Sequence, residues 1–210
     1  MFFIFDWDGT LCDSTANIVR CMHRAASTHN LPALDDAQVQ NIIGLGLPEA
    51  IQALYPELEP QGVESMRAAY AEHFVSADSQ PSTMFSNAEL TLERLLNNGH
   101  QIAVATGKSR AGLDRVLASV GMLDVFHATR CSDETASKPH PLMLHELLAE
   151  MKVPTEEAIM IGDTEFDMEM ARRADMPRIA VDYGAHHISR LKPYEPILCA
   201  SDISDILALA

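Results

Sequence analysis

The hydrophobic and polar positions follow two different rhythms along the chain. Four apolar residues at 2–5 run directly into Asp6, and a short apolar run that ends at a turn signal predicts a buried strand. From 14 to 80 the apolar positions recur at helical spacing, with no strand pattern between them. One of the expected helices carries its apolar side chains at Val63, Met66, Tyr70 and Phe74. We therefore expect an all-helical block directly after the first strand.

The expected helices of this block have recognisable ends. The first covers roughly 15–30 and stops before the dipeptide "LP". Asp35 or Asp36 would cap a short second helix that ends at Gly44, and Pro48 suits the first turn of a third. The block thus reads as four helices in sequence.

From about residue 84 the pattern changes to strands that alternate with helices. Ser86 with Glu89 forms a capping-box pattern, which predicts a helix start, and Gly99 would end that helix. The expected strands are "QIAVATG", "DVFHA", "EAIMIGD" and "RIAVD", and the expected helices cover 109–120, 141–151 and "TEFDMEMARRA". Alternation of this kind predicts an α/β fold, a Rossmann-like, doubly wound parallel sheet with helices on both faces.

The first strand is too apolar to stand alone, so it belongs with the second half of the chain. We therefore expect an α/β core domain over 1–13 and 83–210. The helical residues 14–82 would form a cap domain that is inserted after the first strand.

Composition and charge narrow the classes of partner. The 210 residues are 47% hydrophobic and carry a formal net charge of −15, which disfavours nucleic acid and anionic membranes because both bind basic surfaces. The four cysteines show no paired spacing, and no apolar run could cross a bilayer. These features predict a cytoplasmic protein with reduced thiols.

The expected strand ends all carry reactive side chains. In an open parallel sheet the ligand site lies at the carboxyl ends of the strands. The ends supply Asp6 and Asp8, Thr106, Asp163 and, one turn later, Asp167, while the loop before Pro141 supplies Lys138. Acids, a hydroxyl and a lysine should therefore meet at one edge.

These stretches resemble the four motifs of the haloacid dehalogenase superfamily, and within it the phosphatases similar to phosphoglycolate phosphatase. "DWDGT" looks like the first motif, "VATGKS" the second, "SKPHP" the third and "GDTEFD" the fourth. The helical block lies where that family places its small cap. One difference is Leu142, where many relatives carry an acid after the second proline of the lysine motif.

The resemblance implies Mg²⁺-dependent phosphomonoester hydrolysis. Asp6 would be the nucleophile that forms an aspartyl-phosphate, and Asp8 would protonate the leaving alcohol and then activate water. The Asp6 carboxylate, the Asp8 carbonyl and Asp163 would hold Mg²⁺. Asp167 would orient Lys138 or a metal-bound water.

Other residues of the same motifs would bind the phosphoryl group. Lys138 would bridge the nucleophile and a phosphoryl oxygen, and Thr106 would donate a hydrogen bond beside Gly107. Gly9 and Thr10 would let backbone amides approach the phosphoryl oxygens.

The presence or absence of particular residues separates hydrolysis from the other reactions of the family. Dehalogenases of the family lack an acid at the position of Asp8, and phosphonate-cleaving relatives need a cap lysine, whereas 13–82 contain none. A β-phosphoglucomutase-type mutase would share the motifs, but its cap binds a sugar bisphosphate with basic residues. Residues 13–82 contain three arginines against nine acids, which favours a hydrolase. A non-catalytic phosphate-binding module is a further alternative, although such a module would not need Asp8.

The substrate is expected to be a small phosphorylated metabolite, phosphoglycolate being one case, and the protein a monomer or homodimer. The carboxylate of phosphoglycolate could bind Arg20 or the backbone amides of the glycine-bearing turn at 42–49. This turn could equally be a plain connection between two helices. The residues expected to set specificity are Arg20, Gly44, Leu45, Gly46, Leu47, Ser109 and Arg110. The His186–His187 pair lacks further ligands at metal-site spacing, which favours a solvated loop.

Overall fold

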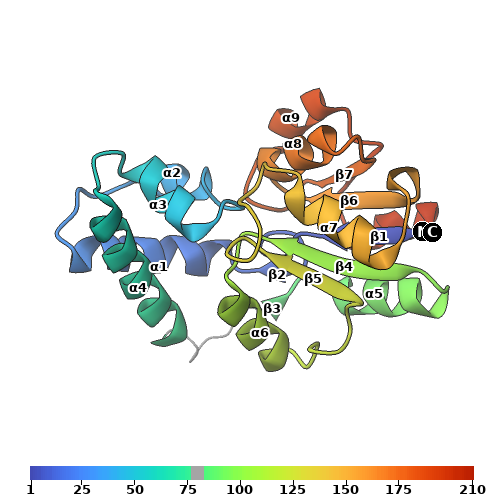
Figure 1. Ribbon diagram of the computed structural model, residues 1–210, viewed down its shortest axis with the longest axis horizontal. Helices are drawn as coiled ribbons and strands as arrows, with labels where there is room; N and C mark the ends of the chain where they lie inside the picture. The colour runs from blue at the N-terminus through green and yellow to red at the C-terminus, as the bar shows by residue number, and fades with distance from the viewer. Residues whose placement is uncertain (77–82) are drawn as a thin grey trace.

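The computed structural model describes residues 1–76 and 83–210 and contains a six-stranded sheet in the order β5-β4-β1-β6-β7-β8 (Figure 1). All five pairings in this sheet are parallel. The strands are β1 (Phe2–Phe5), β4 (Gln101–Thr106), β5 (Ala128–Cys131), β6 (Ala158–Gly162), β7 (Arg178–Val181) and β8 (Leu198–Ala200). Because the chain builds outward from β1 in both directions, the sheet is doubly wound, which confirms the predicted α/β class.

Both faces of the sheet are covered by helices. The helices of the core are α5 (Ala88–Asn97), α6 (Arg110–Ser119), α7 (Leu142–Met151), α8 (Glu165–Arg173) and α9 (Ile188–Leu191). Alternate side chains of β1 divide between the two sides: Phe3 and Phe5 pack with residues of α5 and α6, and Phe2 and Ile4 pack with residues of α7 and α8. This explains why β1 is apolar at every position.

Residues 14–76 form the helical layer drawn beside the sheet in Figure 1. Its helices are α1 (Thr15–Thr28), α2 (Asp36–Gln40), α3 (Leu47–Leu54) and α4 (Pro60–Ser76). They enclose a hydrophobic cluster of their own, in which Met22, Ile51 and Met66 are almost fully buried. The expected cap boundary near residue 82 lies outside the described residues, and the division into domains stays a prediction.

A short antiparallel ladder joins the helical layer to the sheet. It pairs β2 (Cys12–Asp13) with β3 (Thr83–Met84). The same ladder explains why the predicted capping box at Ser86 is wrong. The Phe85 amide still donates to Leu11, and α5 begins only after Asn87, which adopts a left-handed φ of 64° at the N-cap.

Two further element ends differ from the prediction. The strand expected at "DVFHA" begins later, at Ala128, because Ala128 is the first residue in register with Ala103 of β4. The side chains of Val125 and Phe126 pack against the core from the preceding loop. The second cap helix ends at Gln40 instead of Gly44, which leaves 41–46 as a turn.

Among the described residues, no helix is both long and apolar enough to span a membrane. All four cysteines are free, and three of them are buried.

Helix α5 offers a matched test of the packing. Leu95 is fully buried against the sheet, whereas Leu90 on the same helix is 46% exposed. Leu95→Ala should lower the free energy of unfolding by about 2–5 kcal/mol because it removes buried methyl groups and leaves a cavity. Leu90→Ala should change it by less than about 0.5 kcal/mol. Urea denaturation of both variants checks this, and equal effects would contradict the assigned orientation of the helix.

Candidate active site

Asp6 and Asp8 follow directly on the central strand β1. The Asp6 amide continues the sheet by donating to the Ile161 carbonyl at 2.9 Å, so the strand itself fixes the position of Asp6. Trp7 between them is fully buried on the side of the sheet that carries α5 and α6. The alternation of the strand therefore places both carboxylates on the other side.

Lys138 is fully buried between two carboxylates. Its Nζ lies 2.6 Å from Oδ1 of Asp6 and 2.6 Å from Oδ1 of Asp167. Apart from this ion pair, the Asp6 carboxylate has no hydrogen-bond partner among the described residues. Burial alone would lower the pKa of the Lys138 ammonium, but the charges of Asp167 and Asp6 raise it overall. Lys138 is therefore favoured in its cationic form beside Asp6.

The start of α8 positions Asp167. Thr164 is the N-cap of this helix, and its backbone amide and hydroxyl both donate to Oδ2 of Asp167, at 3.0 and 2.6 Å. The other oxygen of Asp167 accepts from Lys138. Both oxygens of Asp167 are thus engaged, and one of them holds the Lys138 ammonium in place. Its predicted role, to orient Lys138 or a metal-bound water during the reaction, stays a prediction.

Asp163 follows β6 and is enclosed by backbone. Thr10 donates its hydroxyl to Oδ1 at 3.0 Å, and the Ala185 amide donates to Oδ2 at 2.7 Å. A Cβ built on Gly9 or Gly184 would lie only 2.2 Å from an atom of the Asp163 side chain, so both positions require glycine. Burial and the nearby Asp167 raise the pKa of Asp163 to about 7.

A third buried carboxylate, Asp163, lies beside the two that contact the Lys138 ammonium. Oxygens of Asp6, Asp163 and Asp167 lie within 4.8 Å of one another. Burial raises the pKa of Asp6 well above its usual range, although Lys138 opposes the shift. With all three carboxylates ionised, they and the lysine carry a net charge of −2. A divalent cation would balance this charge and would favour the ionised state of the carboxylates. Carboxylate oxygens are also the ligands that Mg²⁺ prefers, so the residues present fit a magnesium ion.

Thr106 ends β4 beside β1 and is fully buried. Its hydroxyl accepts a hydrogen bond from the Lys108 amide at 3.2 Å. The amides of Gly9 and Thr10 donate to Cys12 and Trp7 within the loop, so their use on a phosphoryl group stays a prediction.

Lys108 is the site residue that the sequence reasoning missed. Its Nζ lies 3.0 Å from Oδ2 of Asp8, and it also lies 4.7 Å from the centre of the Phe74 ring on cap helix α4. Ser14, at the N-cap of α1, donates to the other oxygen of Asp8 at 2.5 Å. A lysine one residue past the strand-end glycine was the available signal, since a lysine at a strand end reaches the same edge as the acids.

The turn between α2 and α3 contacts the core directly above the site. The Gly46 amide donates to Oγ of Ser137 at 2.8 Å. A Cβ on Gly107 would lie 2.4 Å from the carbonyl oxygen of Leu45, so two backbones meet there without side chains between them. Gly44 has a left-handed φ of 103° and faces Thr164. The structure therefore places Gly44, Leu45 and Leu47 in the lining of the cavity that contains Asp6 and Asp8, whereas Gly46 contacts Ser137 and is not among the lining residues.

The other expected specificity residues lie in different places. Ser109 caps α6 and lines the cavity above the site. The guanidinium of Arg110 instead binds Glu134, Asp114 and Thr129. Arg20 is exposed and donates to Asn17. Neither arginine is among the residues that line the cavity.

The expectation that both histidines lie in a solvated loop is wrong for His186, which is buried. His187 is exposed. His186 accepts a hydrogen bond from the Glu165 amide at 3.1 Å and lies 3.3 Å from the Asn41 carbonyl of the cap. Burial lowers the pKa of this imidazole, so its neutral form joins the core to the cap turn.

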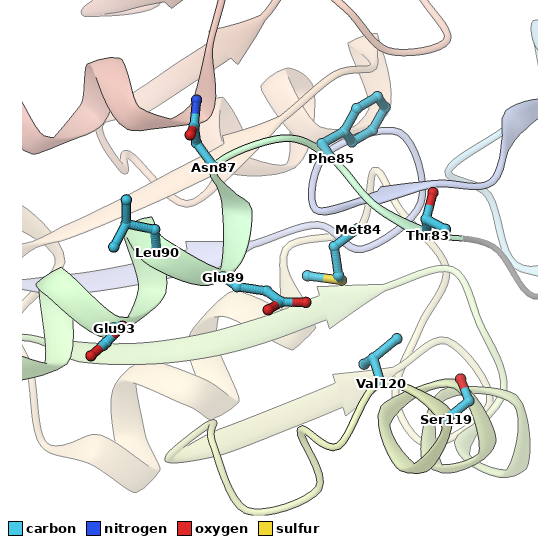
Figure 2. A pocket seen from close by; sticks show the side chains of 9 residues that line it. All are labelled: Thr83, Met84, Phe85, Asn87, Glu89, Leu90, Glu93, Ser119 and Val120. Carbon is cyan, nitrogen blue, oxygen red and sulfur yellow. The ribbon is translucent and has the colours of Figure 1, made fainter.

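A cavity of about 550 Å³ extends from Asp6 and Asp8 to the cap helices. A second hollow, of about 650 Å³, lies where β3 and α5 meet the end of α6 (Figure 2). Its described lining is Thr83, Met84, Phe85, Asn87, Glu89, Leu90, Glu93, Ser119 and Val120. This lining contains no lysine or arginine, so it offers no cation to a phosphate, and the first cavity is the candidate active site.

Comparison with known proteins agrees with this geometry. The chain is 29% identical to a phosphoglycolate phosphatase of Yersinia pseudotuberculosis, over 97% of this chain and 90% of that protein. It is 30% identical to a protein named "Probable phosphatase IndB" from Dickeya dadantii, over 99% of this chain and 92% of that protein. A solved haloacid dehalogenase-like hydrolase from Bacteroides fragilis superposes with a TM-score of 0.89 at 25% identity, covering 98% of each chain.

The family match covers every motif described above. Residues 3–181 match the sequence model of the haloacid dehalogenase-like hydrolases, a range that runs from β1 to the end of β7. This protein therefore belongs to the haloacid dehalogenase-like hydrolase family.

Proposed function

We propose that the protein is a Mg²⁺-dependent phosphatase that hydrolyses a small phosphomonoester through an aspartyl-phosphate on Asp6. The observation that carries the proposal is the buried pairing of Asp6 with Lys138, with Asp8 on the same edge. The phosphatase names of the matched relatives support the same reaction.

In the first half-reaction an Asp6 oxygen attacks phosphorus. The bond from phosphorus to the ester oxygen breaks, and its electron pair goes to the leaving alcohol. Asp8 supplies the proton that this oxygen needs. Lys138 offsets negative charge on the nucleophile and on the phosphoryl oxygen next to it, while Thr106 donates to a second phosphoryl oxygen.

In the second half-reaction water attacks the aspartyl-phosphate. Asp8, now ionised, takes the proton of that water, and the phosphoryl–Asp6 bond breaks to release inorganic phosphate and regenerate the carboxylate. Each residue thus ends the cycle in the state in which it began.

Asp6, Asp163 and the Asp8 carbonyl would hold Mg²⁺, which supplies positive charge to the phosphoryl oxygens when bound. The Thr10 and Ala185 hydrogen bonds keep Asp163 in place for this role.

The cap charges support hydrolysis over a phosphosugar mutase. Arg67, the cap arginine that lines the cavity, is already paired with Glu64 at 2.5 Å, and Arg20 lies elsewhere. A second phosphate would therefore find no unpaired arginine among the described cap residues that line the cavity. Phosphoglycolate is the first substrate to assay, because it is named for the relatives.

Asp6→Asn should lower kcat by about 10⁴-fold or more, because an amide is a poor nucleophile toward phosphorus. Phosphate release from a panel of phosphomonoesters in Mg²⁺ measures the loss. Asp124→Asn, at an exposed position, is the matched control and should retain wild-type turnover. Unchanged turnover in Asp6→Asn would rule out the assigned nucleophile.

Asp8→Asn should separate the two half-reactions. Turnover of alkyl phosphates should fall about 10²–10⁴-fold, since their leaving oxygen needs a proton. With p-nitrophenyl phosphate, whose leaving group is stable as an anion, one equivalent of p-nitrophenol should appear quickly. The phosphoryl group should then remain on Asp6, visible in the intact protein mass. A steady-state rate without such a burst would contradict the dual role of Asp8.

Magnesium should raise the melting temperature independently of turnover. At about 100 times Kd, binding adds about 2.7 kcal/mol, or roughly 5–10 °C for a chain of this size. Asp163→Asn should lose most of the Mg²⁺-dependent shift, even though removing a buried charge could stabilise the metal-free protein. Differential scanning fluorimetry with and without Mg²⁺ tests this, and a full shift in Asp163→Asn would remove Asp163 from the metal site.

A further inference from the structure

The cavity is much larger than a phosphoryl group requires. Its volume of about 550 Å³ lies within the roughly 300–1,000 Å³ of typical small-molecule pockets. Asp6 and Asp8 lie at its inner end, and the remainder extends along cap helices α1 and α4 and the 42–47 turn. Most of the space is thus available to the leaving group of a substrate.

The cap wall of this space is mostly apolar. Its hydrophobic residues are Ile18, Met22, Ile42, Ile43, Leu45, Leu47, Ala50, Tyr70, Ala71 and Phe74. The rings of Tyr70 and Phe74 stack with centroids 5.9 Å apart and an angle of 30° between their planes. Two aromatic rings of one helix thus line the cavity, with the Lys108 ammonium 4.7 Å from the centre of the Phe74 ring. A further ring could add to this pair by stacking, chiefly on Tyr70.

Two of the three cations that line the cavity have partners; the third, Arg115, has no ion-pair partner among the described residues and lies on α6, outside the cap wall. Arg67 binds Glu64 through two nitrogens, and Lys108 pairs with Asp8. Arg115 is exposed to solvent. A buried carboxylate on the leaving group would need an unpaired cation, because burying a lone charge is costly. The wall suits an uncharged leaving group better than a second acid.

We propose that this wall is a subsite for an apolar leaving group, so that the preferred substrates are phosphomonoesters of alcohols that carry a ring or a short hydrocarbon chain. The proposal rests on the phosphatase function above and specifies its substrate class. The ring or chain packs against Tyr70 and Phe74, while the phosphoryl group occupies the Asp6 end.

A series of primary alkyl phosphates tests the subsite, since their leaving alcohols differ little in acidity. The series comprises ethyl, n-propyl, n-butyl and 2-phenylethyl phosphate, with phosphoglycolate as the charged two-carbon ester. We expect kcat/KM to rise about 3- to 5-fold per methylene and to be at least about 10-fold higher for 2-phenylethyl than for ethyl phosphate. A flat series, or phosphoglycolate as the best substrate, would overturn the proposal.

Variants at Tyr70 locate the effect. Tyr70→Ala should reduce the ratio of kcat/KM between 2-phenylethyl and ethyl phosphate about 10-fold, and Tyr70→Phe, which keeps the ring, should restore it. Leu90→Ala, in the second hollow, should keep the wild-type ratio. An unchanged ratio in Tyr70→Ala would contradict the assigned wall.

Binding separates a failure of the subsite from a failure of the phosphatase function. In Mg²⁺, 2-phenylethylphosphonate should bind the wild-type protein at least about 10-fold more tightly than ethylphosphonate, by calorimetry. The function fails if no ester is hydrolysed or if Asp6→Asn has no effect. The subsite fails if the two phosphonates bind equally, whatever the turnover.

Discussion

The site is organised around one buried ammonium between two buried carboxylates. Lys138 contacts Asp6 and Asp167 at 2.6 Å, and none of the three side chains is more than marginally exposed. Removing one member of such a cluster leaves an uncompensated buried charge, whereas the complete cluster fixes three chain segments relative to one another. The end of β1, the loop before α7 and the start of α8 are therefore held together by charge as well as by the sheet.

The charges of this site destabilise the fold, and the rest of the structure has to offset that cost. Three carboxylates within a few ångströms repel one another, and the hydrophobic core beneath the sheet must offset that cost. The full burial of β1 on both faces supplies such a core directly below the acids. In β1, the burial of the apolar residues thus stabilises the fold, and this offsets the destabilising repulsion among the carboxylates at the end of the strand.

The sequence alone was sufficient for the parts that repeat a strong local pattern. The order of strands and helices after residue 84 follows from periodicity. The meeting of Asp6, Lys138, Asp163 and Asp167 at one edge follows from the topology of parallel sheets. Strands of two or three residues, such as β2, β3 and β8, carry too few positions for a pattern and went undetected.

Other features depend on contacts between distant segments. The helix start at Asn87 is set by the pairing of Phe85 with Leu11, which no local signal near Ser86 could indicate. The burial of His186 depends on Asn41, far earlier in the chain. The contacts of Lys108 with Asp8 and Phe74 need both the sheet and the cap, so its place directly after Thr106 and Gly107 indicates the edge it reaches but not its partners.

The meeting of Gly107 with the Leu45 carbonyl has a consequence for how such proteins diverge. Because the contact joins main chain to main chain, the turn keeps its place over the phosphoryl position whatever side chains it carries at its outer face. Under the proposed function, substitutions in the turn would alter which alcohols fit, while the distance from the turn to Asp6 would be preserved. Because Gly107 has no side chain, substrate preference could change during evolution while the reaction stays the same.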